Sequence, residues 1–159
     1  MVTLRRVLCP VDFSDTAHAA LRYAVDFCQR FDAELTLLHV YQAPGFTLPE
    51  GMVVAGADVF TDLLRDIEAA LARWREDAQR RGVRVVHTAT VAGATHPEIA
   101  RYADEQGFDL VVIGTHGRTG IAHALLGSTA EKVVRYAHCP VLTVRAAPED
   151  RTSLSSQER

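Results

Sequence analysis

Glycines and hydroxyl residues lie close together in the segment GTHGRTGIAHALLGST, residues 114–129. Glycines let the backbone turn sharply and point its N–H groups outward. Gly127 comes directly before Ser128, where a helix is expected to begin. Backbone N–H groups, a helix N-terminus and serine or threonine hydroxyls favour an anion, most naturally phosphate. The segment therefore predicts a phosphate site. The alternative is a plain turn followed by a helix whose N-terminus is capped by a Ser128–Glu131 capping box.

Three better-known sites do not match the residues present. A P-loop needs a lysine before its Ser or Thr, but Gly127 is followed directly by Ser128, and the only lysine, Lys132, lies inside the expected helix. The dinucleotide pattern G-x-G-x-x-G does not follow the first expected strand. A phosphorelay receiver needs an acceptor Asp after the third strand and a lysine after the fifth, but residues 89–93 contain no Asp and Arg145 is not lysine.

One carboxylate, Asp12, ends the apolar run RRVLCPV and follows Pro10 and Val11. Ligands of open parallel sheets bind beyond the carboxyl ends of the strands. Asp12 is therefore expected to face the same crevice as the glycine-rich segment, if their two strands are neighbours. The alternative is a carboxylate that caps the following helix near Ser14. We identify no candidate general base beyond Asp12 and no arginine finger other than Arg118.

Apolar runs and amphipathic segments alternate along the chain, and they must position these candidates. Strands are expected at residues 5–11, 34–41, 83–91, 109–114 and 141–145, and helices at 17–31, 60–81, 95–107 and 128–137. The first, second and fourth runs are almost continuously apolar, as strands buried on both faces require. The pattern predicts one α/β domain, with an open five-stranded parallel sheet and helices on both faces.

Several local signals mark where these elements begin and end. Ser14 is a candidate N-cap for the first helix, and Gly82 is a candidate C-terminal cap for the second. Thr95 and Glu98 have capping-box spacing at the start of the third. The long loop at residues 42–58 follows the second strand, so we expect it to be mobile and to fold over a bound ligand as a lid.

Composition narrows the class of protein. A chain of 159 residues can bury a substantial single core, and a net charge of −3 offers no basic surface for nucleic acid. The three cysteines and seven histidines show no metal-ligand spacing, so we expect no metal site of the chain's own, and unpaired cysteines favour the reducing cytoplasm. The amino terminus turns polar at Asp12, too early for a signal-peptide core, and no apolar run is long enough to cross a membrane.

The spacing Gly114-x2-Gly117-x9-Gly127-Ser128 resembles the G-2x-G-9x-G-[S/T] signature of the ATP-binding branch of the universal stress protein family. GRTG at residues 117–120 and HCPVLTV at 138–144 are also typical of that family, and the resemblance covers nearly the whole chain. It implies a Rossmann-like fold of the adenine nucleotide alpha hydrolase type, with strand order 3-2-1-4-5. Strands one and four would then lie side by side.

The resemblance also implies a ligand, ATP, with or without Mg²⁺. Asp12 would face the ribose or a phosphate-bound metal, Pro10 the adenine side, and the Val40 backbone the adenine itself. Residues 114–120 would wrap the ribose and phosphates, and the start of the following helix would bind the outer phosphates. The complete set of implied binding residues is Pro10, Val11, Asp12, Val40, Gly114, Thr115, His116, Gly117, Arg118, Thr119, Gly120, Gly127, Ser128, Thr129 and Ala130.

Two functional classes follow from this site. The first is a regulatory or stress-response module whose ATP occupancy changes its shape or its protein partner. The second is a slow ATP hydrolase or nucleotide-dependent transferase, because one carboxylate and one arginine would support little phosphoryl transfer. We favour the regulatory module and assign no catalytic residue.

The sequence also suggests how the protein assembles and where its domain ends. The last strand, PVLTV, is short and apolar, so it is expected to lie at the edge of the sheet. The family resemblance implies a homodimer through antiparallel pairing of that strand about a two-fold axis. Residues 1–145 would form the nucleotide-binding domain, and the polar residues 146–159 a disordered tail.

Overall fold

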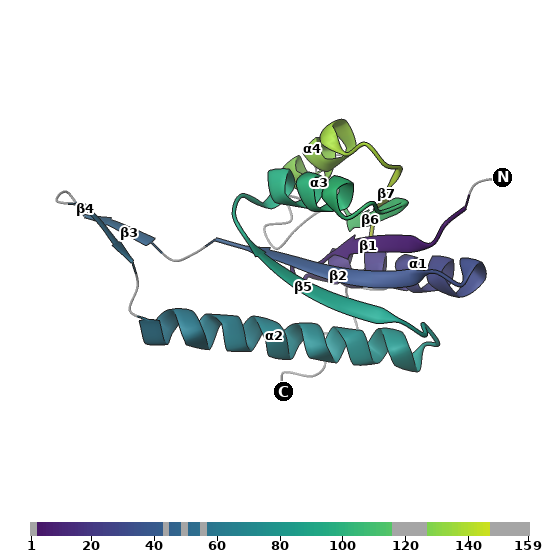
Figure 1. Ribbon diagram of the computed structural model, residues 1–159, viewed down its shortest axis with the longest axis horizontal. Coiled ribbons are helices and arrows are strands. Elements are labelled where there is room, and N and C mark those ends of the chain that lie inside the picture. The colour runs from purple at the N-terminus through teal and green to yellow at the C-terminus, as the bar shows by residue number, and fades with distance from the viewer. Residues whose placement is uncertain (1–2, 43–44, 49–50, 55–56, 116–126, 147–159) are drawn as a thin grey trace.

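A computed structural model describes residues 3–42, 45–48, 51–54, 57–115 and 127–146. Strands and helices alternate along these residues, apart from one hairpin (Figure 1). The strands are β1 (Arg6–Pro10), β2 (Glu34–Tyr41), β3 (Gly45–Leu48), β4 (Gly51–Val54), β5 (Val86–Ala92), β6 (Leu110–Gly114) and β7 (Val141–Val144). The helices are α1 (Asp15–Phe31), α2 (Ala57–Arg80), α3 (Thr95–Glu105) and α4 (Ser128–Tyr136).

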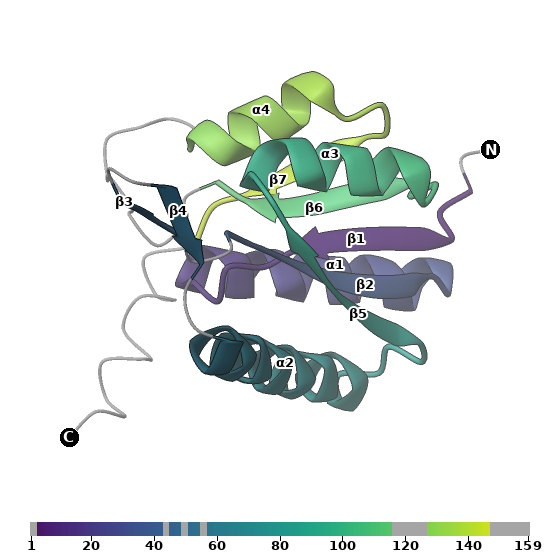
Figure 2. The ribbon, with the colours of Figure 1, turned by 60° about the vertical axis from the view of Figure 1, so that its left-hand side comes forward.

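The main sheet has five parallel strands in the order β5-β2-β1-β6-β7. Counted along the chain without the hairpin, this is the predicted order 3-2-1-4-5, which is confirmed. Helices α1 and α2 cover one face, and α3 and α4 cover the other (Figures 1 and 2). Because β1 lies at the centre, its side chains are buried on both faces: Val7 and Cys9 pack on the α1 side and Leu8 on the α3 side.

The segment expected to be a loop, residues 42–58, instead contains an antiparallel hairpin of β3 and β4, and α2 already begins at Ala57. The hairpin projects beyond the end of β2, away from the main sheet (Figure 1). The sequence is consistent with this hairpin. The apolar stretches GFTL and GMVV flank a Pro-Glu pair and are rich in strand-forming residues.

Two of the three predicted helix caps hold. The Ser14 side chain accepts a hydrogen bond from the Ala17 N–H at 3.2 Å and caps α1. Gly82 has φ +103° just after α2, as a left-handed cap requires. The Thr95–Glu98 capping box is wrong, because Ala94 is the N-cap of α3 and has no side chain to accept a bond. The Glu98 carboxylate accepts a hydrogen bond from Arg101 Nε at 3.0 Å instead.

Among the residues that the structure describes, no helix is both long and apolar enough to span a membrane.

Candidate functional site

The candidate site lies at the carboxyl edge of the sheet, where β1 and β6 end as neighbours. Val7 is in register with Leu110 and Leu8 with Val111. This pairing brings the turn at Asp12 and the end of β6 to one edge, as predicted. Val40 belongs to β2 and reaches the same edge, since β2 is the other neighbour of β1.

Asp12 lies in the turn between β1 and α1 and is half buried. Its Oδ1 accepts hydrogen bonds from the Ser14 backbone N–H at 3.0 Å and from the Ser14 hydroxyl at 2.5 Å. The same Ser14 hydroxyl caps α1, so the carboxylate and the helix start are joined through one side chain. The structure thus gives Asp12 the helix-start contacts of the alternative interpretation, while placing it at the binding edge of the sheet.

The residue after Asp12, Phe13, has φ +63°, which is rare for a bulky side chain. Its ring stacks on the imidazole of His39 with ring centres 4.8 Å apart and meets the edge of Trp74 at 5.7 Å. His39 Nδ1 lies 2.7 Å from the Val11 carbonyl oxygen. These three ring residues were not among the predicted site residues. A left-handed Phe leaves no signal in a sequence, so only the structure could identify them.

Gly114, the last residue of β6, is close to the first turn of α1. A Cβ atom there would lie 2.8 Å from the carbonyl carbon and oxygen of Thr16 and 3.1 Å from the Ala17 nitrogen. Helix–strand packing therefore accounts for this glycine without any ligand. The glycine spacing alone had suggested room for a phosphate at this position, and the structure supplies a different physical reason.

Thr115 and Gly127 enclose the glycine-rich segment. The Thr115 N–H donates to the Val144 carbonyl at 2.8 Å, and the Thr115 carbonyl accepts from the Gly127 N–H at 2.6 Å. Thr115 and Gly127 therefore lie side by side at the end of β6. Five predicted binding residues lie outside the described part of the chain: His116, Gly117, Arg118, Thr119 and Gly120.

Helix α4 begins without a side-chain cap. Gly127 is its N-cap, and Ser128 is its first helical residue, with an exposed side chain. The alternative Ser128–Glu131 capping box is wrong, because the helix starts one residue earlier than that box requires and the Glu131 carboxylate pairs with Arg135 at 3.1 Å. The helix supplies no acceptor for the N–H groups of its first residues. Ser128, Thr129 and Ala130 therefore offer donors at the carboxyl edge.

Burial raises the pKa values of two thiols, and the described residues form no cluster of metal ligands. Burial raises the pKa of the Cys28 thiol to about 12, and burial together with the nearby Cys28 raises that of Cys9 further. Both therefore remain neutral thiols at physiological pH. Within the described residues, no group of three or more His, Cys, Asp or Glu side chains is arranged to hold a metal ion.

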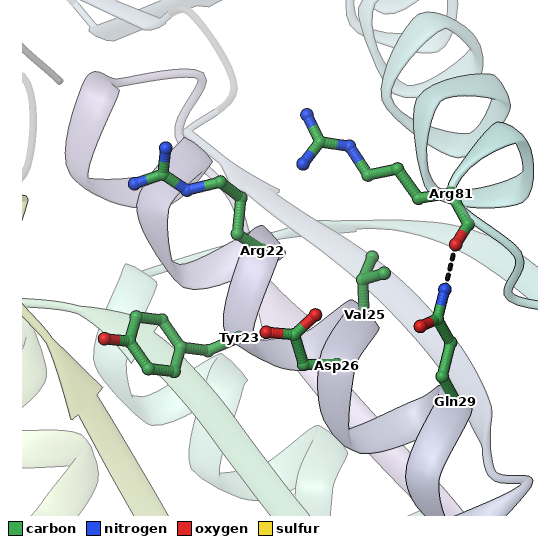
Figure 3. Close-up of a pocket in the computed structure, with 6 residues that line it drawn as sticks. All are labelled: Arg22, Tyr23, Val25, Asp26, Gln29 and Arg81. Atoms are coloured by element: carbon green, nitrogen blue, oxygen red, sulfur yellow. Dashed lines mark hydrogen bonds between the residues drawn. The ribbon is translucent and has the colours of Figure 1, made fainter.

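A separate groove of about 480 Å³ lies along the outer side of α1, beside the end of α2 (Figure 3). The Gln29 side chain donates a hydrogen bond to the Arg81 carbonyl there and fastens the two helices together. The groove contains none of the predicted nucleotide-binding residues. Its lining residues are Arg22, Tyr23, Val25, Asp26, Gln29 and Arg81.

Known proteins resemble this chain along most of its length. Universal stress protein MJ0531 of Methanocaldococcus jannaschii is 34% identical over 143 residues, which cover 89% of this chain and 82% of that protein. The structure of universal stress protein UspA from Lactobacillus plantarum superposes with a TM-score of 0.78 at 28% identity, covering 91% of this chain and 100% of that one. A universal stress protein solved in complex with cAMP gives a TM-score of 0.67 at 26% identity, covering 91% and 99%.

The model of the universal stress protein family matches residues 3–145. This match includes all the described strands and helices and the whole candidate site. Together with the relative that is 34% identical, it establishes that the chain belongs to the universal stress protein family.

Proposed function

We propose that this protein binds ATP at the carboxyl edge of β1 and β6 and acts as a nucleotide-dependent regulatory module. The observation that carries the proposal is the start of α4, which has no side-chain cap and is joined to the end of β6 by the bond from the Gly127 N–H to Thr115. Phosphate oxygens would accept from the N–H groups that the helix itself leaves without acceptors. The Ser128 and Thr129 hydroxyls would add further donors.

Adenine is the base we assign to this edge. A family member of 26% identity was solved in complex with cAMP, an adenine nucleotide. In this chain, Val40 packs against the apolar cluster on the α3 side of the sheet. Its backbone would meet the base near the end of β2, beside Pro10 at the end of β1.

The residues present would suit binding better than hydrolysis. Phosphoryl transfer needs a group that orients the attacking water and charges that stabilise the transition state. The only carboxylate we assign to this edge, Asp12, has Oδ1 occupied by two hydrogen bonds from Ser14. Asp12 would therefore hold a ribose hydroxyl or a phosphate-bound Mg²⁺ through its remaining oxygen, while positioned by Ser14.

The same fold also suggests how the protein assembles and in which compartment it acts. We propose a cytoplasmic homodimer paired through β7, whose nucleotide-binding domain is residues 1–145 and which responds to ATP through a downstream protein. Strand β7 is the outermost strand of the described sheet on the β6 side. Cys9 and Cys28 are unpaired and buried, which suits a reducing compartment.

The test measures nucleotide content and affinity. Nucleotide is extracted from freshly purified protein, and ATP–Mg²⁺ binding is measured by calorimetry for the parent, Gly127→Val, Ser128→Ala and Ser128→Thr. A side chain at Gly127 should displace two or three charge-assisted hydrogen bonds of about 1.5–3 kcal/mol each, weakening ATP binding by orders of magnitude. Ser128→Ala should cost less, and Ser128→Thr, which keeps the hydroxyl, should bind like the parent.

Stability of the same variants provides the control. Since Ser128 does not cap α4, Ser128→Ala should change the free energy of unfolding by less than the roughly 1 kcal/mol typical of a lost cap. Absence of ATP binding in the parent, or undiminished binding in Gly127→Val, would refute the phosphate site. Fast ATP turnover that disappears in Asp12→Asn would instead favour the enzyme.

A further inference from the structure

In the turn between β1 and α1, Phe13 has a backbone conformation that residues with a side chain disfavour. Phe13 has φ +63°, and Cβ-bearing residues avoid this region because the side chain crowds the backbone. Such conformations persist only where surrounding contacts hold them, and they gather at functional sites. Phe13 is also directly bonded to Asp12, the carboxylate at the candidate nucleotide site.

The first contact that holds this turn comes from β2. The N–H of Val11, the residue just after β1, donates to the Leu38 carbonyl of β2 at 2.8 Å. The Val11 carbonyl then lies 2.7 Å from His39 Nδ1. Because a carbonyl oxygen can only accept, Nδ1 must carry the proton. The His39 side chain thus binds the carbonyl of Val11, the residue just after β1, and the backbone turns at the next residue, Asp12.

The second contact is ring packing on the α2 side of the sheet. The Phe13 ring is stacked on His39, with ring planes 26° apart, and lies edge-on to Trp74 at 78°. Trp74 comes from α2 and is half buried, and its ring also meets the edge of His18 at 5.3 Å. The ring of Phe13 is therefore held between β2 and α2, and this packing fixes the position of the Phe13 backbone.

We infer that Phe13, His39 and Trp74, here called the aromatic clamp, are positioning residues that fix Asp12 for nucleotide binding. The inference rests on the proposed function and adds residues to which that function assigned no role. The clamp fixes the backbone on both sides of Asp12: His39 holds Val11, and the ring contacts hold Phe13. Ser14 then holds the carboxylate itself by its two hydrogen bonds to Oδ1.

The test compares variants that remove a ring inside and outside the clamp. ATP–Mg²⁺ affinity is measured for the parent, Phe13→Ala, Phe13→Tyr and Phe31→Ala, at a temperature where circular dichroism finds each folded. Phe31 ends α1, is half exposed and stacks on the ring of Phe27, away from the clamp, so it is the matched control. Phe13→Ala should bind ATP about tenfold more weakly, because the released turn leaves Asp12 in several orientations. Phe13→Tyr and Phe31→Ala should bind like the parent.

A double-mutant cycle separates positioning from a general loss of structure. In the Asp12→Asn background, Phe13→Ala should cost little further affinity, since its effect acts through that carboxylate. In the Ser128→Ala background the same change should cost about the full tenfold, since α4 is independent of the turn. His39→Leu, which removes the donor to Val11, should reproduce the loss seen for Phe13→Ala.

The outcomes distinguish this inference from the proposed function. A parent protein that binds no ATP refutes both. A parent that binds ATP while Phe13→Ala behaves like Phe31→Ala refutes the clamp alone. Equal losses in the Asp12→Asn and Ser128→Ala backgrounds refute positioning through Asp12.

Discussion

A Cβ atom on Gly114 would lie 2.8 Å from both the carbonyl carbon and the carbonyl oxygen of Thr16. The end of β6 and the first turn of α1 are thus packed backbone against backbone. The same turn of α1 carries the Ser14 cap and follows Asp12. Gly114 therefore supports the candidate site indirectly, by letting α1 approach the sheet.

Gly114→Ala is expected to lower the free energy of unfolding. The added methyl group meets backbone, which cannot move aside as a flexible side chain would, and overpacking of this kind costs about 1–3 kcal/mol. Urea denaturation without nucleotide measures the change. Ser128→Ala provides the contrast, because we expect it to weaken ATP binding with little effect on unfolding. Unchanged stability in Gly114→Ala would mean that α1 does not rest on β6 this closely.

The contact between Asp104 and His138 is expected to make stability depend on acid pH. His138 Nδ1 lies 2.6 Å from Asp104 Oδ2, and this hydrogen bond holds the pKa of that carboxyl below its ordinary value. A carboxyl with a lowered folded-state pKa stabilises the fold above its unfolded pKa of about 3.9, and loses that contribution as the pH falls through the folded value.

The free energy of unfolding should therefore fall more steeply below about pH 4 in the parent than in Asp104→Asn or His138→Ala. Asp62→Asn, which removes an exposed carboxylate paired with Arg65 on α2, serves as the control and should keep the parental slope. Parallel curves for the parent and Asp104→Asn would contradict the role of this contact.

Strand β7 is expected to carry the dimer contact. It is the edge of the described sheet beside β6, and Leu142 on it is half buried. An apolar edge invites pairing with another chain. Light scattering at micromolar concentration should report a dimer, and Leu142→Lys should shift it towards monomer. Val59→Lys adds the same charge at an exposed position on α2 and should leave the dimer intact. A monomeric parent would exclude this assembly.

The hairpin of β3 and β4 is expected to be cut by protease more slowly when ATP is bound. It follows β2, the strand that carries Val40, and projects from the carboxyl edge (Figure 2). Two-stranded hairpins are marginal alone in water, so packing over a nucleotide should protect this one. Residues 42–58 contain no Lys or Arg, so chymotrypsin rather than trypsin is the probe. Equal cleavage with and without ATP would refute the hypothesis that this hairpin folds over the nucleotide as a lid.

The main architecture can be predicted from the sequence alone. Continuous apolar runs such as VLCPV mark strands buried on both faces, and alternation with amphipathic helices requires parallel strands joined by crossovers. The strand order came from the family resemblance carried by the glycine spacing. These features are predictable because they depend on periodicity and residue spacing, which are local properties of the chain.

The details of the candidate site depend on tertiary contacts. The left-handed Phe13 depends on contacts with His39 and Trp74, far from it in the sequence. The close packing at Gly114 depends on how α1 crosses β6. The position of Gly127, the N-cap of α4, beside the end of β6 likewise depends on its hydrogen bond to Thr115. Each is a contact between segments that only the folded chain brings together, so no local pattern specifies it.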